Sequence, residues 1–185
     1  RMVHLELVSD LNEWLDWAYP RGIDHRITSY LKFKPGNLYA FNPDHTDKTY
    51  ACNRTWEFAN RVMKVTEDND PDRLPMLAGT LSEGVAREFL GFCKIDQDLP
   101  KIPQIVDNPE GIKVPEEPSI LFALTGSIGH NASKDNLGQL MKYVNRLPKE
   151  FQVVTMREVV RRNTANLAHE AVQKWVAAST VSLFG

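Results

Sequence analysis

Apolar residues recur at helical spacing along most of this chain, and this pattern limits its fold more than any other feature. The clearest stripe runs from Leu137 to Leu147, with apolar side chains at intervals of three and four residues. Such intervals place them on one face of an α-helix. Similar stripes comprise Leu11, Trp14, Leu15 and Ala18; Ile27, Tyr30, Leu31 and Phe33; Trp56, Ala59, Val62 and Met63; Val85, Phe89, Phe92 and Cys93; and Ile120, Leu121, Leu124 and Ile128. The sequence therefore predicts a mainly α-helical protein.

Two more helices are predicted near the C-terminal end, from Met156 to Arg162 and from Leu167 to Val176. The second of them is centred on Trp175. Three tryptophans, Trp14, Trp56 and Trp175, fall on the apolar stripes of three different helices. We therefore expect all three indole rings to be buried.

One segment shows a different period. Val3, Leu5 and Leu7 alternate with His4 and Glu6, which is typical of a half-buried strand. A single strand cannot satisfy its own backbone hydrogen-bonding groups and needs a partner. Two interpretations stay open for this segment: the last strand of a larger sheet, or an extended arm packed on the helices.

The composition is that of an ordinary globular protein, with 42% hydrophobic and 25% charged residues. The net charge of −2 argues against a protein whose whole surface is a basic nucleic-acid-binding face. No apolar run is long enough to span a bilayer, and no signal region opens the chain, so we expect a cytoplasmic location and no membrane partner. Cys52 and Cys93 make no disulfide framework, and no metal-binding spacing is present, so no metal site is predicted.

A basic bias appears from Lys134 onward, with eight Lys or Arg against four Asp or Glu. Lys149, Arg157, Arg161 and Arg162 are candidates for a patch that binds nucleic acid or an acidic partner. An excess of this size is more often a solvated helix face. Both interpretations stay open at this point.

The segment from Cys52 to Phe58 carries the strongest functional signal. A loop with Pro43, Asp44, Asp47 and Asn53 leads into the stripe that begins at Trp56, which predicts a helix start with Arg54 in its first turn. The helix dipole is positive there, so an arginine is unfavourable unless an anion approaches it. The simpler alternative is an exposed arginine whose stem covers apolar surface.

The run Arg54-Thr55-Trp56-Glu57 resembles the sensor-2 motif of MoxR-type AAA+ ATPases, in the branch found in bacteriophages and prophages. The usual form of that motif is Ser-Pro-Arg, whereas Cys52 and Asn53 precede the arginine here, and Asn53 could itself cap the helix. The resemblance covers about residues 1–95, including "WLDWA", "YLKFKPGNLYAFNP" and "EGVAREFLGF". It extends more loosely to "YVNRLPKEFQ".

This resemblance implies a lid-like helical bundle with an N-terminal single strand and a C-terminal helical extension. Residues 1–8 would be the last strand of the AAA+ core and residues 9–97 the lid domain with sensor 2. Residues 98–118, which hold five of the eleven prolines, would be a connection, and residues 119–185 the extension. Helices on both sides of the connection could still share one buried core.

The resemblance also implies roles for two arginines. Arg54 would reach the γ-phosphate of ATP, and Arg1 would be an arginine finger that acts on the neighbouring subunit of a homo-oligomeric ring. ATP and magnesium would be bound in the full-length protein by an N-terminal AAA+ core, which would be the partner of this chain. We therefore expect the chain to be the C-terminal part of a longer ATPase that remodels a client protein.

The catalytic parts of an ATPase are missing from the sequence itself. No GxxxxGK[ST] motif occurs: Gly79 and Gly84 have the spacing of its glycines, but Val85 stands where lysine is required. Without a phosphate cradle or a metal site, phosphoryl transfer loses the positioning on which it depends. We therefore expect no bound cofactor and no catalysis by this chain alone. A second hypothesis is a self-contained helical module that binds protein or nucleic acid.

Overall fold

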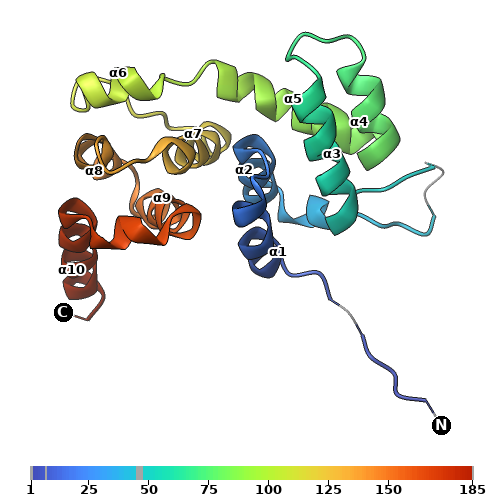
Figure 1. Ribbon diagram of the computed structural model, residues 1–185, viewed down its shortest axis with the longest axis horizontal. Coiled ribbons are helices and arrows are strands. Elements are labelled where there is room, and N and C mark those ends of the chain that lie inside the picture. The colour runs from blue at the N-terminus through green and yellow to red at the C-terminus, as the bar shows by residue number, and fades with distance from the viewer. Residues whose placement is uncertain (1, 7, 45–47, 185) are drawn as a thin grey trace. The chain divides into compact units, whose positions relative to one another are not determined.

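The computed structural model describes residues 2–6, 8–44 and 48–184, with side chains as far as Ser179. All regular elements in this part of the chain are helices (Figure 1), which confirms the mainly α-helical prediction. By its internal packing the chain divides into two compact units, residues 1–91 and residues 92–185.

The predicted N-terminal strand is wrong for the described residues. Residues 2–6 and Val8 form no regular element, and Figure 1 shows them leading away from α1 (Leu11–Ala18). Val3 is 86% exposed and Leu5 is 84% exposed, so the alternative of an arm packed on helices is wrong as well. Leu7 lies outside the described residues. The physical reason is that no second strand is present in the described part of the chain to pair with this one.

The first unit begins with short helices that have clear start and stop signals. Asp10 caps α1 by accepting a 2.9 Å hydrogen bond from the backbone N–H of Glu13. Gly22, with φ of +63°, ends the 3-10 turn η1 (Tyr19–Arg21) in the left-handed conformation that glycine tolerates best. Asp24 caps α2 in turn. The remaining elements of this unit are α2 (His25–Phe33), η2 (Pro35–Leu38), α3 (Asn53–Val65), α4 (Arg73–Leu81) and the first part of α5 (Glu83–Gln97).

Three aromatic rings from three helices form the centre of this unit. Tyr30, Trp56 and Phe89 lie with ring centroids between 5.4 and 5.7 Å apart, at tilted and edge-to-face angles that aromatic pairs prefer. Trp56 is fully buried, and its indole N–H donates a 2.8 Å hydrogen bond to the carbonyl of Asn37. The buried stripe predicted for α3 is therefore confirmed at its largest residue.

The turn between α3 and α4 is fixed by a buried arginine that the sequence pattern did not reveal. Arg73 is 3% exposed, and its Nε donates to the Thr66 hydroxyl at 2.9 Å. Its other nitrogens bond the Thr66 carbonyl and the Asp68 carboxylate. The acidic loop before α4 thus supplies the partners that a buried guanidinium requires.

A single residue, Ser82, joins α4 to α5. Its φ of +85° and ψ of 157° lie in a region that non-glycine residues seldom occupy. Its backbone N–H still completes α4 by donating to the Ala78 carbonyl at 3.1 Å. The two helices therefore meet at a sharp joint with no intervening loop.

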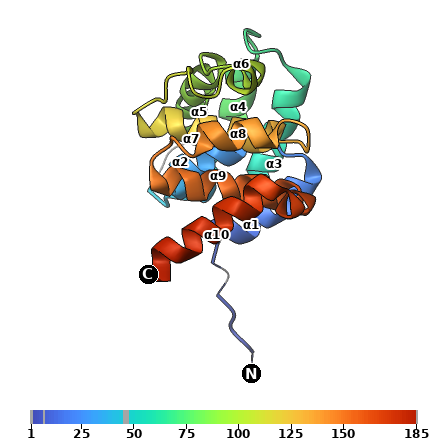
Figure 2. The ribbon, with the colours of Figure 1, turned by 90° about the vertical axis from the view of Figure 1, so that its left-hand side faces the viewer.

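The second unit contains the end of α5, then α6 (Ile102–Asp107), α7 (Pro118–Asn131), α8 (Leu137–Val144), α9 (Lys149–Arg162), η3 (Thr164–Ala168) and α10 (Glu170–Phe184). In Figures 1 and 2, α7 packs on α9, α8 packs on α10, and α6 lies across α7 and α8. Helices α7 and α9 approach closely, because a Cβ on Gly129 would lie only 2.5 Å from the Cβ of Glu158. Helix α6 lies within the proline-rich segment 98–118.

The predicted C-terminal helix is confirmed as α10, but its start and the burial of Trp175 differ from the prediction. Leu167 belongs to the 3-10 turn η3 and is 49% exposed, and the last helix begins only at Glu170. Trp175 is half-buried, whereas Trp14 and Trp56 are buried as predicted. The indole N–H of Trp175 donates a 3.1 Å hydrogen bond to the buried Gln152 side chain, so the ring lies at the edge of the core.

Candidate functional site

The start of α3 is built by a local exchange of hydrogen bonds. Cys52 has an extended backbone and occupies the cap position, so Asn53 is the first helical residue and not the cap. The backbone N–H of Cys52 donates to the Thr55 hydroxyl at 2.8 Å, and this hydroxyl lies 3.0 Å from the Cys52 carbonyl. Thr55 thus fills the N3 position of a capping box, whereas the usual motif has its hydroxyl at the cap position itself.

Asn53 joins the start of α3 to the start of α1. Its side-chain oxygen accepts a 2.6 Å hydrogen bond from the Ser9 hydroxyl. Its backbone carbonyl accepts a 3.2 Å hydrogen bond from the indole N–H of Trp14. These bonds fix the backbone on which Arg54 stands, at a point where two helix N-termini lie side by side.

A cavity of about 420 Å³ lies at this junction. Its lining residues are Val8, Asp10, Glu13, Trp14, Trp17, Asn53, Arg54 and Glu57. The indole rings of Trp14 and Trp17 have centroids 6.0 Å apart and form its apolar wall. The candidate sensor residue therefore lines a cavity that also has an aromatic surface.

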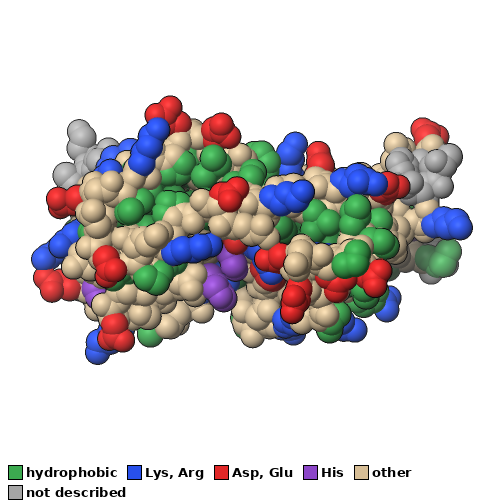
Figure 3. Space-filling model, turned by 90° about the horizontal axis from the view of Figure 1, so that it is seen from above, with side chains coloured by type: hydrophobic (Ala, Val, Ile, Leu, Met, Phe, Trp, Pro, Cys, Tyr) green, Lys and Arg blue, Asp and Glu red, His purple; other side chains and the backbone are tan. Residues whose placement is uncertain are grey.

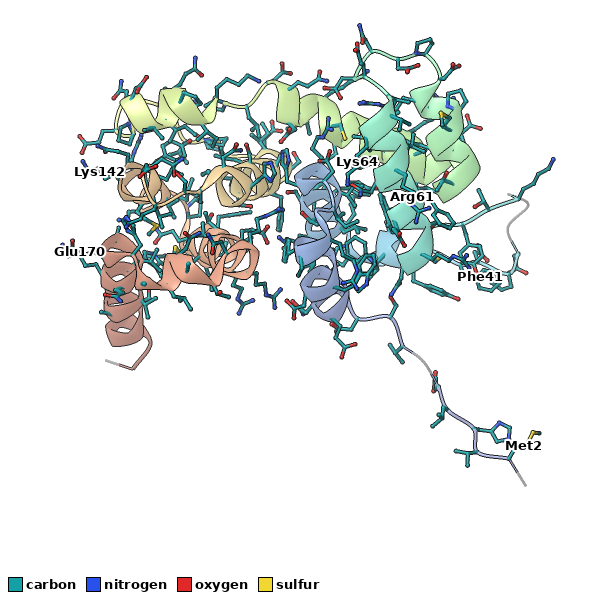
Figure 4. The ribbon with its side chains drawn as sticks, in the orientation of Figure 1. Met2, Phe41, Arg61, Lys64, Lys142 and Glu170 are labelled. Atoms are coloured by element: carbon teal, nitrogen blue, oxygen red, sulfur yellow. The ribbon has the colours of Figure 1, made fainter. Side chains whose placement is uncertain are left out.

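Arg54 itself is exposed, and no described carboxylate is in ion-pair contact with it. Its guanidinium lies 5.4 Å from the centre of the Phe58 ring, which is a cation–π distance. Glu57, the nearest acidic neighbour in the sequence, pairs with Arg61 at 2.6 Å. Figure 4 labels Arg61, which lies farther along α3. Asp47, a second acidic neighbour, lies outside the described residues.

Acidic side chains outnumber basic ones around Arg54, which the motif for a phosphate-binding arginine does not predict. Three carboxylates, from Asp10, Glu13 and Glu57, line the cavity with one guanidinium. The carboxylate of Asp10 is occupied in capping α1, and that of Glu57 in pairing with Arg61. The cavity can offer an anion the Arg54 guanidinium and the positive end of the α3 dipole. Among its described lining residues there is no second cationic side chain.

The remaining candidate residues are the predicted arginine finger and the basic residues of the C-terminal part, and none of the described ones lines the cavity at Arg54. Arg1, the predicted arginine finger, lies outside the described residues. Within the second unit, Lys149 stands at the start of α9 and Arg161 at its end, about 18 Å away at 1.5 Å per residue. Arg162 is paired with the buried Glu158. Lys149 therefore lies apart from Arg161 and Arg162, whereas Arg157 stands about one helical turn before Arg161. Acidic and basic side chains are interspersed on the face that Figure 3 draws.

A second cavity in the first unit was not predicted. It has a volume of about 460 Å³ and lies between the segment before α3 and the start of α5. The lining residues are Ala40, Phe41, Asn42, Pro43, Thr49, Tyr50, Ser82, Gly84, Val85 and Glu88. The only sequence signal was the aromatic content of the segment Tyr39–Tyr50. Such rings look like core residues until the structure shows them exposed.

Comparisons with known protein families, curated proteins and solved structures find no match to this chain. Among the described residues, no group of three or more His, Cys, Asp or Glu side chains is placed to hold a metal ion. Nor does any helix in the described part combine the length and apolar character needed to cross a bilayer.

Proposed function

We propose that residues 9–97 act as the nucleotide-sensing lid of a MoxR-type AAA+ ATPase, and that Arg54 contacts the terminal phosphate of ATP bound to a separate core. The observation that carries this proposal is the state of Arg54. It is exposed, it lines a cavity at two helix N-termini, and no described carboxylate holds it. A purely structural arginine would be expected to engage a carboxylate through its planar fork.

The acidic lining of the same cavity limits what this lid can do alone. Because carboxylates outnumber the guanidinium, a polyphosphate would be repelled unless other groups neutralised its charge. The core would have to supply the phosphate cradle and the magnesium site, which the described residues of this chain do not provide. The contribution of Arg54 would then be one charged hydrogen bond to a phosphate oxygen, made when the lid closes.

The decisive experiment uses an ATPase in which this chain follows its nucleotide-binding core. Arg54→Ala is expected to lower ATP turnover by about 100-fold or more, the usual effect of removing one electrostatic contact to a transition state. Arg61→Ala is the matched control, because Arg61 lies on the same helix near the same Phe58 ring. If both variants lost ATP turnover equally, or if neither lost it, the support for a sensor role would be removed.

The second hypothesis, a self-contained helical binding module, is favoured by a different observation. Tyr39, Phe41 and Tyr50 are between 40% and 53% exposed, and the Tyr50 ring contacts the other two. Clustered exposed aromatic rings are typical of interaction surfaces. A purified chain that binds a protein partner through these rings, with Arg54→Ala having no effect in any nucleotide assay, would favour this hypothesis over the lid.

A further inference from the structure

The cavity beside α5 combines exposed aromatic rings with a carboxylate held in position. Phe41 and Tyr50 line it, with ring centroids 4.9 Å apart, and Tyr39 contacts Tyr50 at 6.0 Å from outside the cavity. Figure 4 shows Phe41 on the segment that precedes α3. Aromatic faces carry negative electrostatic potential and attract cations.

The aromatic rim is anchored to the helices at both ends. The backbone N–H of Ala40 donates to the Ala51 carbonyl at 2.8 Å, which closes the base of the loop. The hydroxyl of Thr49 donates to the Thr80 carbonyl at 3.0 Å, which attaches the returning segment to the end of α4. The rings are therefore presented by a segment whose two ends are held, and a ligand need not order those ends on binding.

Glu88 supplies the negative charge of the cavity. One of its carboxylate oxygens accepts hydrogen bonds from the Tyr30 hydroxyl and the Asn37 amide, both at 3.0 Å. Both donors are neutral, and no described cationic side chain pairs with Glu88. The donors fix the orientation of the carboxylate and leave its charge without a counter-ion among the described residues.

We propose that this cavity binds an arginine side chain of a partner protein. A guanidinium is planar and carries donors on its edge, so it can stack on one open face of the edge-to-face Phe41–Tyr50 pair and donate to the Glu88 carboxylate that lines the same cavity. A partner protein is favoured over a small free cation because the aromatic surface continues beyond the cavity to Tyr39. This inference uses neither Arg54 nor the proposed lid function.

The test titrates the full chain with the peptide acetyl-Gly-Arg-Gly-amide and follows the backbone amide signals of Gly84, Val85 and Glu88 by NMR. Saturable shifts with a dissociation constant of about 1 mM are expected for this single side chain. The same peptide with citrulline in place of arginine has the same shape and no charge. It is expected to bind about tenfold more weakly.

Three variants locate the binding. Glu88→Gln keeps an acceptor for Tyr30 and Asn37 but removes the charge, and it should weaken arginine binding about fivefold or more. Phe41→Ser removes an exposed ring without touching the buried core, and it should weaken binding even if Glu88→Gln proves unstable. Glu83→Gln is the acidic control on the same helix, since Glu83 is already paired with Arg87 at 2.6 Å, and binding should not change.

Equal binding of the arginine and citrulline peptides would overturn the proposal, because the cavity would then be an apolar groove without charge selectivity. Absence of saturable shifts at about 10 mM peptide would overturn it as well. So would an equal loss of binding in Glu83→Gln and Glu88→Gln, since general surface charge would then explain the effect.

Discussion

Glu57 forms its ion pair with Arg61, whose Nη2 lies 2.6 Å from the Glu57 Oε1, and no such pair joins Glu57 to Arg54. Both guanidinium groups nevertheless lie 5.4 Å from the centre of the Phe58 ring. The two arginines thus share an aromatic contact and differ in whether a described carboxylate engages them. This difference makes Arg61 the internal control for experiments on Arg54.

Replacing Arg54 with alanine should hardly affect the stability of the chain. The expected change in the free energy of unfolding is within about 0.5 kcal/mol, as for surface substitutions that break no buried contact. Urea unfolding of Arg54→Ala beside Arg61→Ala and the unchanged chain measures it. A loss above about 1 kcal/mol for Arg54→Ala would indicate a structural role and argue against a sensor.

The isolated chain is expected to show no ATP turnover and no ATP binding in the micromolar range. The sequence lacks a phosphate cradle, and carboxylates outnumber cations around Arg54. Calorimetry with ATP and magnesium, together with an assay for released phosphate, measures both properties. Turnover by the purified chain that disappears in Arg54→Ala would contradict the prediction.

Replacing Trp56 with alanine should remove a large part of the stability of the first unit. The ring is fully buried against Tyr30 and Phe89 and bonds the Asn37 carbonyl, so we expect a cost of about 3–5 kcal/mol. Trp175→Ala is the comparison, because that ring is only half-buried and should cost less. Similar losses for both would mean that burial does not determine the effect.

Replacing a glycine with alanine should have opposite effects on stability at Gly129, where α7 and α9 approach closely, and at Gly79, where the space is open. Gly129→Ala would place a methyl group 2.5 Å from the Cβ of Glu158, and we expect a loss of about 1–3 kcal/mol. Gly79 in α4 has open space where its Cβ would be, so Gly79→Ala should gain about 0.5–1 kcal/mol from helix propensity. Thermal unfolding of the two variants checks the difference in sign.

Asp24 should make the stability of the first unit depend on pH in the acidic range. Burial tends to raise its pKa, but the hydrogen bonds and positive charge of Arg26 outweigh this, so its pKa lies below the ordinary value of 3.8. His25 and Asp68 are the other titratable groups nearby: His25 lies beside Asp24, and Asp68 pairs with Arg26.

A folded-state pKa below the unfolded value means that the stabilisation is complete above about pH 3.8 and is lost as pH falls through the folded value. Asp24→Asn should therefore cost about 1–3 kcal/mol at neutral pH and flatten the acid side of the stability profile. Urea unfolding from neutral pH to below 3 measures both. An unchanged acid limb in Asp24→Asn would show that another carboxylate controls it.

The sequence predicted the helices well because each stripe needs only local periodicity. Trp14 and Trp56 are buried because they lie on such stripes. The prediction of a strand at Val3 and Leu5 was wrong because the alternation of apolar and polar residues is a local signal, whereas a strand depends on a partner strand elsewhere. The predicted burial of Trp175 was wrong because the pattern of the last helix shows which face is apolar but not how fully other helices cover that face.

The candidate site was predictable at one residue only. Arg54 was identified from a motif and a helix start, and it lines a cavity as an exposed side chain. Much of the acidic lining comes from Asp10, which caps α1, and from Glu13 in the first turn of α1, about forty residues before Arg54. Long-range proximity of this kind is not encoded in a local pattern. The position of Glu88 in one cavity with Phe41 escaped prediction for the same reason. The burial of Arg73 escaped because arginine is rarely buried, although its partners Thr66 and Asp68 are close to it in the sequence.

The joint at Ser82 determines where this chain can tolerate changes in length. One residue inserted there would lengthen the joint and change the direction in which α5 leaves α4, so Glu88 would no longer share a cavity with Phe41 and Tyr50. The solvated loop between α3 and α4 has no comparable restriction beyond the contacts of Thr66 and Asp68 with Arg73. Relatives of this chain should therefore vary in length between α3 and α4, keep a single residue at position 82, and often carry glycine there.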